Sequence, residues 1–389
     1  MTVTRGDAAE LTRTLVRVDS RNPSLVPGAP GEGPVARALA EVLRAWGFAV
    51  EVLDAAPNRP NVVARVGPAG GPTLMFNGHL DVVGTEGMTH APFAAEERDG
   101  SLWGRGSSDM KGGVAAMCAA AARAADGSLD CEVIITAVAG EEWDSIGTRA
   151  ILARGVRADA AIVTEPTRLA IAPAHRGFVW TTVTVQGRAA HGSRYDVGVD
   201  AIRHAGLLLA ELDALEPDQL TQRTHPLLGR ASWHASTIDG GLGMSTYPDR
   251  CTLRIERRTL PGETPAQAVE EVRAACARVR ARRPSFGAEV TLDLSQNPSD
   301  VAVDAPVVRC LSAALASAGE TARVEGLSAW TDAALLNEAG IPAICYGPGD
   351  IARAHAAAEW IEIDEIERAT RVLTRLAQSW TRDDEPWRT

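Results

Sequence analysis

Histidine and acidic residues follow four short apolar segments of this sequence, at the points where the segments end. Imidazole nitrogens and carboxylate oxygens together form a donor set that suits zinc. The candidate ligands are His79, Asp109, Glu142, Glu165 and His355. Five ligands exceed what one tetrahedral catalytic zinc ion with an open position can use. They fit two ions about 3.5–4 Å apart if one carboxylate bridges them, as in two-metal hydrolytic sites.

Two further acidic residues stand beside these candidates. Glu141 directly precedes Glu142, and such a pair can divide metal binding and proton transfer between its members, although it could also be a solvated charge pair. Asp81 lies two residues after His79, so it could orient that imidazole or cap the next element. Histidines that are not accompanied by other candidate ligands are expected to be structural or exposed. These are His90, His175, His204, His225 and His234.

The apolar segments that precede the candidates are predicted to be buried β-strands. They cover Thr73–Phe76, Glu132–Val138, Ala160–Thr164 and Pro342–Tyr346, with helix-like stretches such as Lys111–Ala125 and Ala333–Ala339 between them. Strands that alternate with helices indicate an α/β domain whose mostly parallel sheet is covered on both faces. Ligands of open α/β sheets bind beyond the carboxyl ends of the strands, so we expect the candidates to meet at one sheet edge.

The middle of the chain has a different order of predicted elements, strand–helix–strand–strand–helix–strand, which is typical of a small ferredoxin-like α+β domain. The strands are Phe178–Gln186, Trp233–Ile238, Arg250–Arg258 and Ala288–Leu294, and the helices are Gly198–Leu215 and Pro265–Arg282. We therefore expect a catalytic domain of residues 1–176 and 295–389 with an inserted lid domain of residues 177–294. Gly177 and the polar stretch 295–300 are the expected hinges.

The length, charge and composition of the chain exclude some classes of protein. A chain of 389 residues with 45% hydrophobic residues is long enough for two cores. The formal net charge of −11 argues against nucleic acid as a partner, because phosphate binding needs a basic surface. No apolar stretch is long enough to predict a membrane span, and the start lacks the apolar core of a signal peptide. Six scattered cysteines without a CxxC pair indicate free thiols and a cytoplasmic setting.

Several motifs, in order along the chain, resemble those of one enzyme family. They are GHLDVV, GRGSSDMKGG, AGEEWDSIGT, TEPT, AAHGS, ERRTLPGE and the late histidine, and they span roughly residues 15 to 365. The family comprises acetylornithine deacetylases, succinyl-diaminopimelate desuccinylases, aminoacylases and carboxypeptidase G, which are dinuclear zinc hydrolases. The resemblance implies two Zn²⁺ per subunit, with Co²⁺ or Mn²⁺ as substitutes. It also implies a small amide substrate with a carboxylate, and a homodimer formed through the lid domain.

The same resemblance divides the metal ligands and assigns roles to their neighbours. His79, Asp109 and Glu165 would hold one zinc ion, and Asp109, Glu142 and His355 the other, so that Asp109 is the bridge. Glu141 matches the general base of the family, and Asp81 matches the residue that supports the first histidine.

The resemblance also implies residues that contact the substrate, although one of them differs from the family pattern. His191 matches a lid histidine that polarises the scissile carbonyl in the partner's active site, and Arg258 matches an arginine that contacts a substrate carboxylate. Gly347 and Gly349 match a loop that lines the substrate pocket. Ser245 replaces a substrate-contacting asparagine of the family.

Two further departures concern the neighbourhood of the ligands. The late histidine motif lacks its usual proline, and Trp143 and Asp144 stand where smaller residues are common. The resemblance as a whole implies hydrolysis of an N-acyl amino acid or a related small amide, while a dipeptidase or carboxypeptidase activity stays open. A catalytically silent relative and an amide-forming enzyme are alternatives from other classes.

Overall fold

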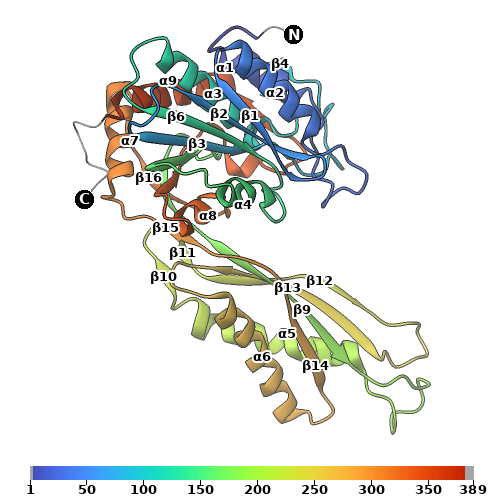
Figure 1. Ribbon diagram of the computed structural model, residues 1–389. Helices are drawn as coiled ribbons and strands as arrows, with labels where there is room; N and C mark the ends of the chain where they lie inside the picture. Colours follow the sequence, from blue (N-terminus) through green and yellow to red (C-terminus); the bar gives the residue numbers. More distant parts are fainter. Residues whose placement is uncertain (1–2, 382–389) are drawn as a thin grey trace. The chain divides into compact units, whose positions relative to one another are not determined.

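The computed structural model describes residues 3–381, except for the side chain of Asp218, and its internal contacts divide the chain into two compact units (Figure 1). Unit 1 takes in the chain up to Pro173, Val301–Glu325, and the residues from Thr331 onward. Unit 2 consists of Ala174–Asp300 and Gly326–Trp330. Within residues 3–381, no helix combines the length and the apolar character that a membrane crossing requires.

A large mixed sheet has the strand order β1-β2-β6-β3-β7-β17-β8, with β15 and β16 also paired to β8. Most of this sheet belongs to unit 1, whereas β15 and the last residues of β8 and β16 belong to unit 2. The four central strands β6, β3, β7 and β17 are parallel, whereas β1, β2 and β8 join antiparallel at the sides. This arrangement confirms the predicted α/β class with a mostly parallel sheet. The strands are β1 (Ala49–Ala56), β2 (Arg59–Val66), β3 (Thr73–His79), β6 (Glu132–Val138), β7 (Ala160–Val163), β8 (Ile171–His175), β15 (Ser299–Asp300), β16 (Val324–Leu327) and β17 (Ala343–Cys345).

Helices cover both faces of this sheet, which explains why its central strands are apolar on both sides. Figure 1 shows α1, α3 and α9 on one side of β3 and β6, and α4 and α8 on the other. Phe76 of β3 and Ile135 of β6 belong to the core under α3 and α9. The helices are α1 (Ala8–Val16), α2 (Gly33–Ala45), η1 (Ser107–Lys111), α3 (Gly112–Ala125), α4 (Ile146–Ala153), α7 (Pro306–Ser317), α8 (Ala333–Glu338), η3 (Ile351–Arg353) and α9 (Ile363–Ser379).

A second, three-stranded sheet of unit 1 has the order β18-β5-β4. Its strands are β4 (Glu96–Arg98), β5 (Ser101–Trp103) and β18 (Trp360–Glu362).

The predicted strands before the candidate ligands are confirmed, with small shifts at their ends. The observed β6 has the predicted limits, and β3 extends three residues beyond the predicted Phe76 to include His79. His79 pairs with Val138 across the parallel ladder, so its backbone is fixed by the sheet. The helix expected from Lys111 starts at Gly112 and is preceded by the irregular turn η1, which contains Asp109.

Unit 2 has a four-stranded antiparallel sheet in the order β12-β13-β9-β14, with α5 and α6 packed against it. Its core joins Val183 of β9, Leu208 of α5 and Val272 of α6. The predicted order of strands and helices is thus observed, with three short elements added. The elements are β9 (Gly177–Gln186), α5 (Ala201–Leu215), η2 (Glu216–Leu220), β10 (Thr224–His225), β11 (Gly229–Arg230), β12 (Ser232–Gly240), β13 (Arg250–Thr259), α6 (Pro265–Arg282) and β14 (Gly287–Gln296).

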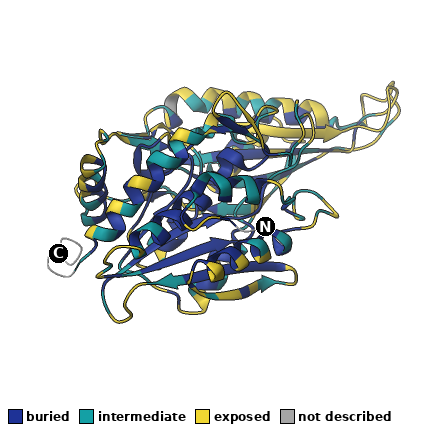
Figure 2. Ribbon diagram, turned by 90° about the horizontal axis from the view of Figure 1, so that it is seen from above, coloured by how far each residue is buried: buried dark blue, intermediate teal, exposed yellow. Residues whose placement is uncertain are grey.

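Helix α5 begins at Ala201 and not at the expected Gly198. The Asp200 side chain accepts a hydrogen bond from the Arg203 N–H at 2.9 Å and caps the helix there. Figure 2 shows several surface helices buried on one side and exposed on the other, as amphipathic helices over a sheet should be. Helix α3 differs from them because it is buried along nearly its whole length.

Candidate metal centre

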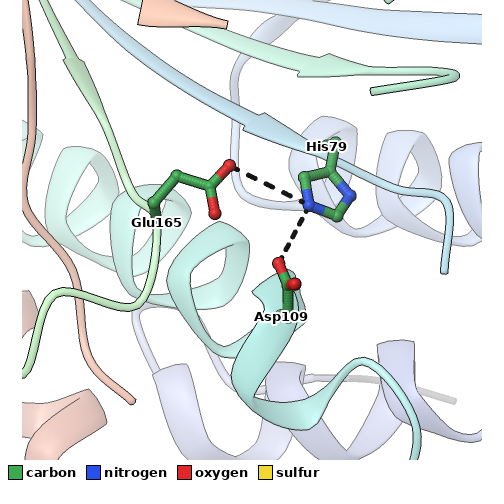
Figure 3. Close-up of side chains that lie close together, drawn as sticks. All are labelled: His79, Asp109 and Glu165. Carbon is green, nitrogen blue, oxygen red and sulfur yellow. Dashed lines mark hydrogen bonds and ion pairs between the residues drawn. The ribbon is translucent and has the colours of Figure 1, made fainter. Parts of the chain in front are cut away.

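Three of the predicted ligands converge at the carboxyl edge of the unit 1 sheet. His79 ends β3, Glu165 follows β7, and Asp109 lies in η1 before α3. Figure 3 shows both carboxylates pointing at the His79 imidazole, whose Nε2 is 3.1 Å from Asp109 Oδ1 and 4.0 Å from Glu165 Oε1. One donor atom from each residue lies within 4.8 Å of the others, a spacing that a single metal ion could span.

A second group of donors shares Asp109 with the first. His355 Nε2 lies 3.5 Å from Asp109 Oδ2 and 3.0 Å from Glu142 Oε2, and donors of these three residues again lie within 4.8 Å of one another. The two oxygens of Asp109 therefore face different histidines, with Oδ1 toward His79 and Oδ2 toward His355. This is the arrangement that a carboxylate bridging two ions needs.

The electrostatics of the cluster also fit bound cations. Burial and the nearby Asp109 carboxylate raise the pKa of Glu165 well above its usual value, and the same two causes raise the pKa of Glu142. Burial opposes protonation of the histidines, yet their carboxylate partners raise the pKa of His79 well above its usual value and that of His355 to about 11. Such crowded acids need positive charge nearby, and metal ions would replace the protons of the two imidazoles.

One orphaned atom supports the same conclusion. Glu165 Oε1 is buried and has no hydrogen-bond partner anywhere in residues 3–381. A buried carboxylate oxygen without a partner destabilises the folded protein unless an ion or a water molecule binds to it. The residues present therefore fit two divalent cations with mixed nitrogen and oxygen donors.

Glu141 lies beside the cluster and belongs to neither donor group. Its Oε2 is 4.0 Å from His79 Nε2, and only 10% of its side chain is exposed. Burial is the main cause that raises the pKa of Glu141 well above its usual value. A buried carboxylate next to the ligands but outside both groups is placed to exchange protons with a molecule held there.

Asp81 acts on the loop after β6 as well as on His79. The Nδ1 atom of His79 bonds to the main-chain carbonyl of Asp81 at 2.9 Å, whereas the nearest Asp81 carboxylate oxygen is 3.7 Å away. That carboxylate instead accepts the N–H groups of Gly140 at 2.9 Å, Glu141 at 3.1 Å and Glu142 at 3.2 Å. The predicted support of His79 thus runs through the backbone, and the side chain fixes the loop that carries Glu141 and Glu142.

Residues that sequence reasoning missed complete this support. The Asn22 amide donates to Asp81 Oδ2 at 2.8 Å, and the buried Glu32 carboxylate accepts the Gly140 N–H at 3.1 Å. Arg59 donates to Glu32 Oε1 at 2.7 Å and to Asn22 Oδ1 at 3.2 Å, so the network is closed and buried. No local pattern marks these residues, because they are separated by long stretches of sequence.

Glu359 supports Asp109 from the other side and was also missed as a functional residue. Its Oε1 accepts the N–H groups of Ser108 and Asp109, both at 3.1 Å, while Arg105 donates to its Oε2 at 2.7 Å. Glu359 is the last residue of the sequence motif that contains His355. Its place in that motif could have identified it as a functional residue from the sequence.

We predict that Asp81→Asn lowers kcat about 10–100-fold, the range typical for residues that orient metal ligands. The amide that replaces the carboxylate offers one acceptor oxygen fewer to three N–H groups, so Glu141 and Glu142 lose their fixed positions. Steady-state kinetics on the zinc-loaded protein measure the effect, with the exposed Asp54→Asn of β1 as the matched control. Equal kcat in the two variants would remove Asp81 from this role.

Gly347 and Gly349 lie in unit 1 close to the ligands. A Cβ at position 347 would meet the main-chain oxygens of Thr164 and Glu165 at 2.4 and 2.5 Å, so only glycine allows this approach. The N–H groups of the two glycines already donate to Thr167 Oγ1 at 3.1 Å and Glu365 Oε2 at 2.8 Å. Contact with substrate through this loop therefore needs groups other than these two N–H donors.

The remaining predicted residues belong to unit 2, and their part in the site stays a prediction. His191 forms an isolated β-bridge with Thr246, and the N–H of the adjacent Gly192 donates to the Ser245 carbonyl at 2.8 Å. His191 and Ser245 therefore lie in two segments that are hydrogen-bonded to each other. Arg258 donates through Nε to Glu256 at 2.5 Å and lies 5.6 Å from the Phe178 ring centroid. Its two terminal nitrogens donate to no residue within 3–381.

Comparison with known proteins identifies the family. The sequence profile of peptidase family M20/M25/M40 matches residues 75–379, which is most of the chain. This chain belongs to peptidase family M20/M25/M40. The M20 chain is similar to an acetylornithine deacetylase of Myxococcus xanthus, with 31% identity over 86% of this chain and 88% of that one. It is also similar to an N-formyl-4-amino-5-aminomethyl-2-methylpyrimidine deformylase of Bacillus subtilis, with 29% identity over 95% and 94% of the two chains.

Solved structures of the family share the fold. Human carnosine dipeptidase 1 superposes with a TM-score of 0.80 at 18% identity, over 97% of this chain and 96% of that one. The resemblance stated from the motifs is thus confirmed at the level of the family. The M20 chain is a metallohydrolase of amide bonds.

Proposed function

We propose that this M20 enzyme is a zinc-dependent amidohydrolase that removes the acyl group from an N-acyl amino acid. Two zinc ions, with Co²⁺ or Mn²⁺ as substitutes, would be held by the two donor groups that share Asp109. When bound, such a pair lowers the pKa of a water molecule from about 15.7 toward about 7. The observation that carries the proposal is the orientation of Asp109, whose two oxygens face His79 and His355 separately.

Glu141 would move the protons of the reaction. Its buried carboxylate would accept a proton from the attacking water and return it to the amine nitrogen as the C–N bond breaks. The Asp81 contacts hold the Glu141 N–H and so fix the start of this side chain. Glu142, the next residue, would remain a ligand, so that the pair divides the two tasks.

Unit 2 would recognise the rest of the substrate. The free terminal nitrogens of Arg258 suit a bidentate pair with a carboxylate, while its Nε stays bound to Glu256. His191 would polarise the scissile carbonyl, and loss of one such donor typically lowers the rate about 10²–10³-fold. Ser245 would donate a hydrogen bond with a shorter reach than asparagine.

We also propose a homodimer formed through unit 2 and a cytoplasmic setting. Within residues 3–381, strand β12 pairs with β13 alone and is an edge strand, and its residues from His234 to Gly240 are exposed. Ile238 on this edge is 56% exposed, and Leu242 in the loop that follows β12 is 77% exposed, which suits pairing with a second copy. The six free cysteines agree with a reducing compartment.

A mixture of two inactive variants tests whether the partner supplies His191. Inactive Glu141→Ala and His191→Ala proteins, mixed in equal amounts and allowed to exchange subunits, should regain about a quarter of the wild-type activity, because about half of the dimers are then hybrids and each hybrid contains one complete site of two. The matched control mixes each variant with itself. Exchange confirmed by labelled subunits without any recovery would contradict supply of His191 by the partner.

A substrate panel tests the proposed reaction. The zinc-loaded protein should hydrolyse at least one class among N-acetyl, N-succinyl, N-formyl and N-carbamoyl amino acids, and should require the acylated amine. Cleavage of unblocked dipeptides without deacylation would make the chain a peptidase. Absence of hydrolysis across the panel, with two metal ions bound, would favour the silent or amide-forming alternatives.

A further inference from the structure

His355 has the most exposed side chain of the five proposed metal ligands. Its side chain is 53% exposed, whereas that of His79 is 1% exposed. Within residues 3–381, its ring contacts run through Nε2 to Asp109 and Glu142, and no residue fixes Nδ1 as the Asp81 carbonyl does for His79. His355 also has a left-handed backbone with φ of +60°, which is unfavourable for a residue with a side chain. Some other contact must keep this imidazole in place.

The loop around His355 offers little stiffness of its own. Residues 354–358 contain four alanines and neither proline nor any large side chain apart from the histidine. Fixing each such residue in one backbone conformation costs about 1–2 kcal/mol of conformational entropy. Thr89 ties the loop to a neighbouring segment, because its N–H at 2.9 Å and its Oγ1 at 3.3 Å both donate to the Ala357 carbonyl.

A cation–π contact closes this loop at its two ends. Arg353 is the last residue before the loop, in η3, and Trp360 begins β18 just after it. The guanidinium carbon of Arg353 lies 3.3 Å from the centroid of the Trp360 ring. Arg353 Nη1 is buried and has no hydrogen-bond partner in residues 3–381, and Nη2 lies 4.0 Å from Glu362 Oε1, which is at the limit of an ion pair. The guanidinium is therefore held mainly by the ring face.

Trp360 is a rigid platform for this contact. Strand β18 pairs with β5, which places Trp360 opposite Trp103, and the two rings stack at 5.8 Å with 25° between their planes. A second arginine, Arg98 of β4, lies over the Trp103 ring at 5.3 Å and is partly exposed. The four side chains make one cluster, of which Arg353 and Trp360 alone flank the His355 loop.

We propose that Arg353 and Trp360 are positioning residues that hold His355 over the second metal position. The inference rests on the proposed dinuclear function and deepens it. Neither residue touches the donor atoms. Their contact fixes the ends of the loop, so that the imidazole is already in place when the ion binds.

Zinc affinity of four variants tests the inference. Arg353→Ala and Trp360→Leu should weaken the second zinc equivalent about tenfold, the lower end of the range for residues that orient ligands, and leave the first unchanged. Competition titration with a fluorescent chelator measures both equivalents. Trp360→Phe keeps a ring face for the guanidinium and should fall between the wild type and Arg353→Ala. Arg98→Ala is the matched control, since it removes an arginine of the same cluster that does not flank the loop.

Activity gives a second, separable measurement. In Arg353→Ala we expect kcat to fall at limiting zinc and to recover as zinc is raised, with little change in KM. Arg353→Ala that titrates like Arg98→Ala would overturn the inference, as would equal weakening of both zinc equivalents. If the wild type binds fewer than two ions, the dinuclear function fails and the inference fails with it. Two ions in the wild type with unchanged variants would overturn the inference alone.

Discussion

Replacement of Glu141 by alanine should remove nearly all turnover while both metal ions remain bound. Glu141 belongs to neither donor group, so its loss leaves six donor contacts from five ligands intact. Loss of a positioned general base typically lowers the rate about 10²–10⁴-fold. Steady-state kinetics and metal analysis on the same sample measure the two effects together.

Two companion variants sharpen this expectation. Glu141→Gln keeps the size of the side chain but cannot accept the proton, so it should be almost as inactive as Glu141→Ala. Glu51→Ala removes an exposed glutamate of β1 and should behave as the wild type. Substantial activity in either Glu141 variant would exclude Glu141 as the base. Loss of a metal ion together with activity would instead make it a ligand.

Replacement of Asp109 by alanine should release both metal ions. Each oxygen of Asp109 faces a different histidine, so the variant would leave two donors at each position, His79 with Glu165 and Glu142 with His355. Two donors are too few for a tight zinc site in a protein. We expect less than one zinc ion per chain at concentrations that fill the wild type, and no measurable turnover.

Glu165→Ala is the informative comparison for this prediction. Glu165 belongs to one donor group only, so its loss should weaken one ion more than the other. Two tightly bound ions in Asp109→Ala would contradict the bridge. Equal losses in Asp109→Ala and Glu165→Ala would mean that the two positions fill and empty together.

The sequence predicted the cluster because parallel strands end at the same edge. His79, Glu142 and Glu165 follow three neighbouring strands, and β3, β6 and β7 indeed lie side by side. Strand limits were predictable within three residues where apolar runs end at polar or glycine residues, as for β6. The same reasoning could not foresee β1 and β2, whose antiparallel pairing gives no signal in the spacing of the ligands.

The supporting contacts could not be predicted for a different reason. The Asp81 carboxylate accepts main-chain N–H groups, which every residue type except proline supplies. The residue types around Glu141 therefore do not indicate this contact. The Arg353 and Trp360 contact depends on β18 pairing with β5, which are far apart along the chain. The roles of His191 and Arg258 came from the family resemblance and remain predictions.

Metal stoichiometry against activity tests the dinuclear site most directly. Protein stripped by chelator and then titrated with zinc should bind two ions per chain, and amide hydrolysis should rise to its full value only as these positions fill. Full hydrolysis after exhaustive metal removal, or saturation at one ion per chain with full activity, would contradict a site built on Asp109 between His79 and His355.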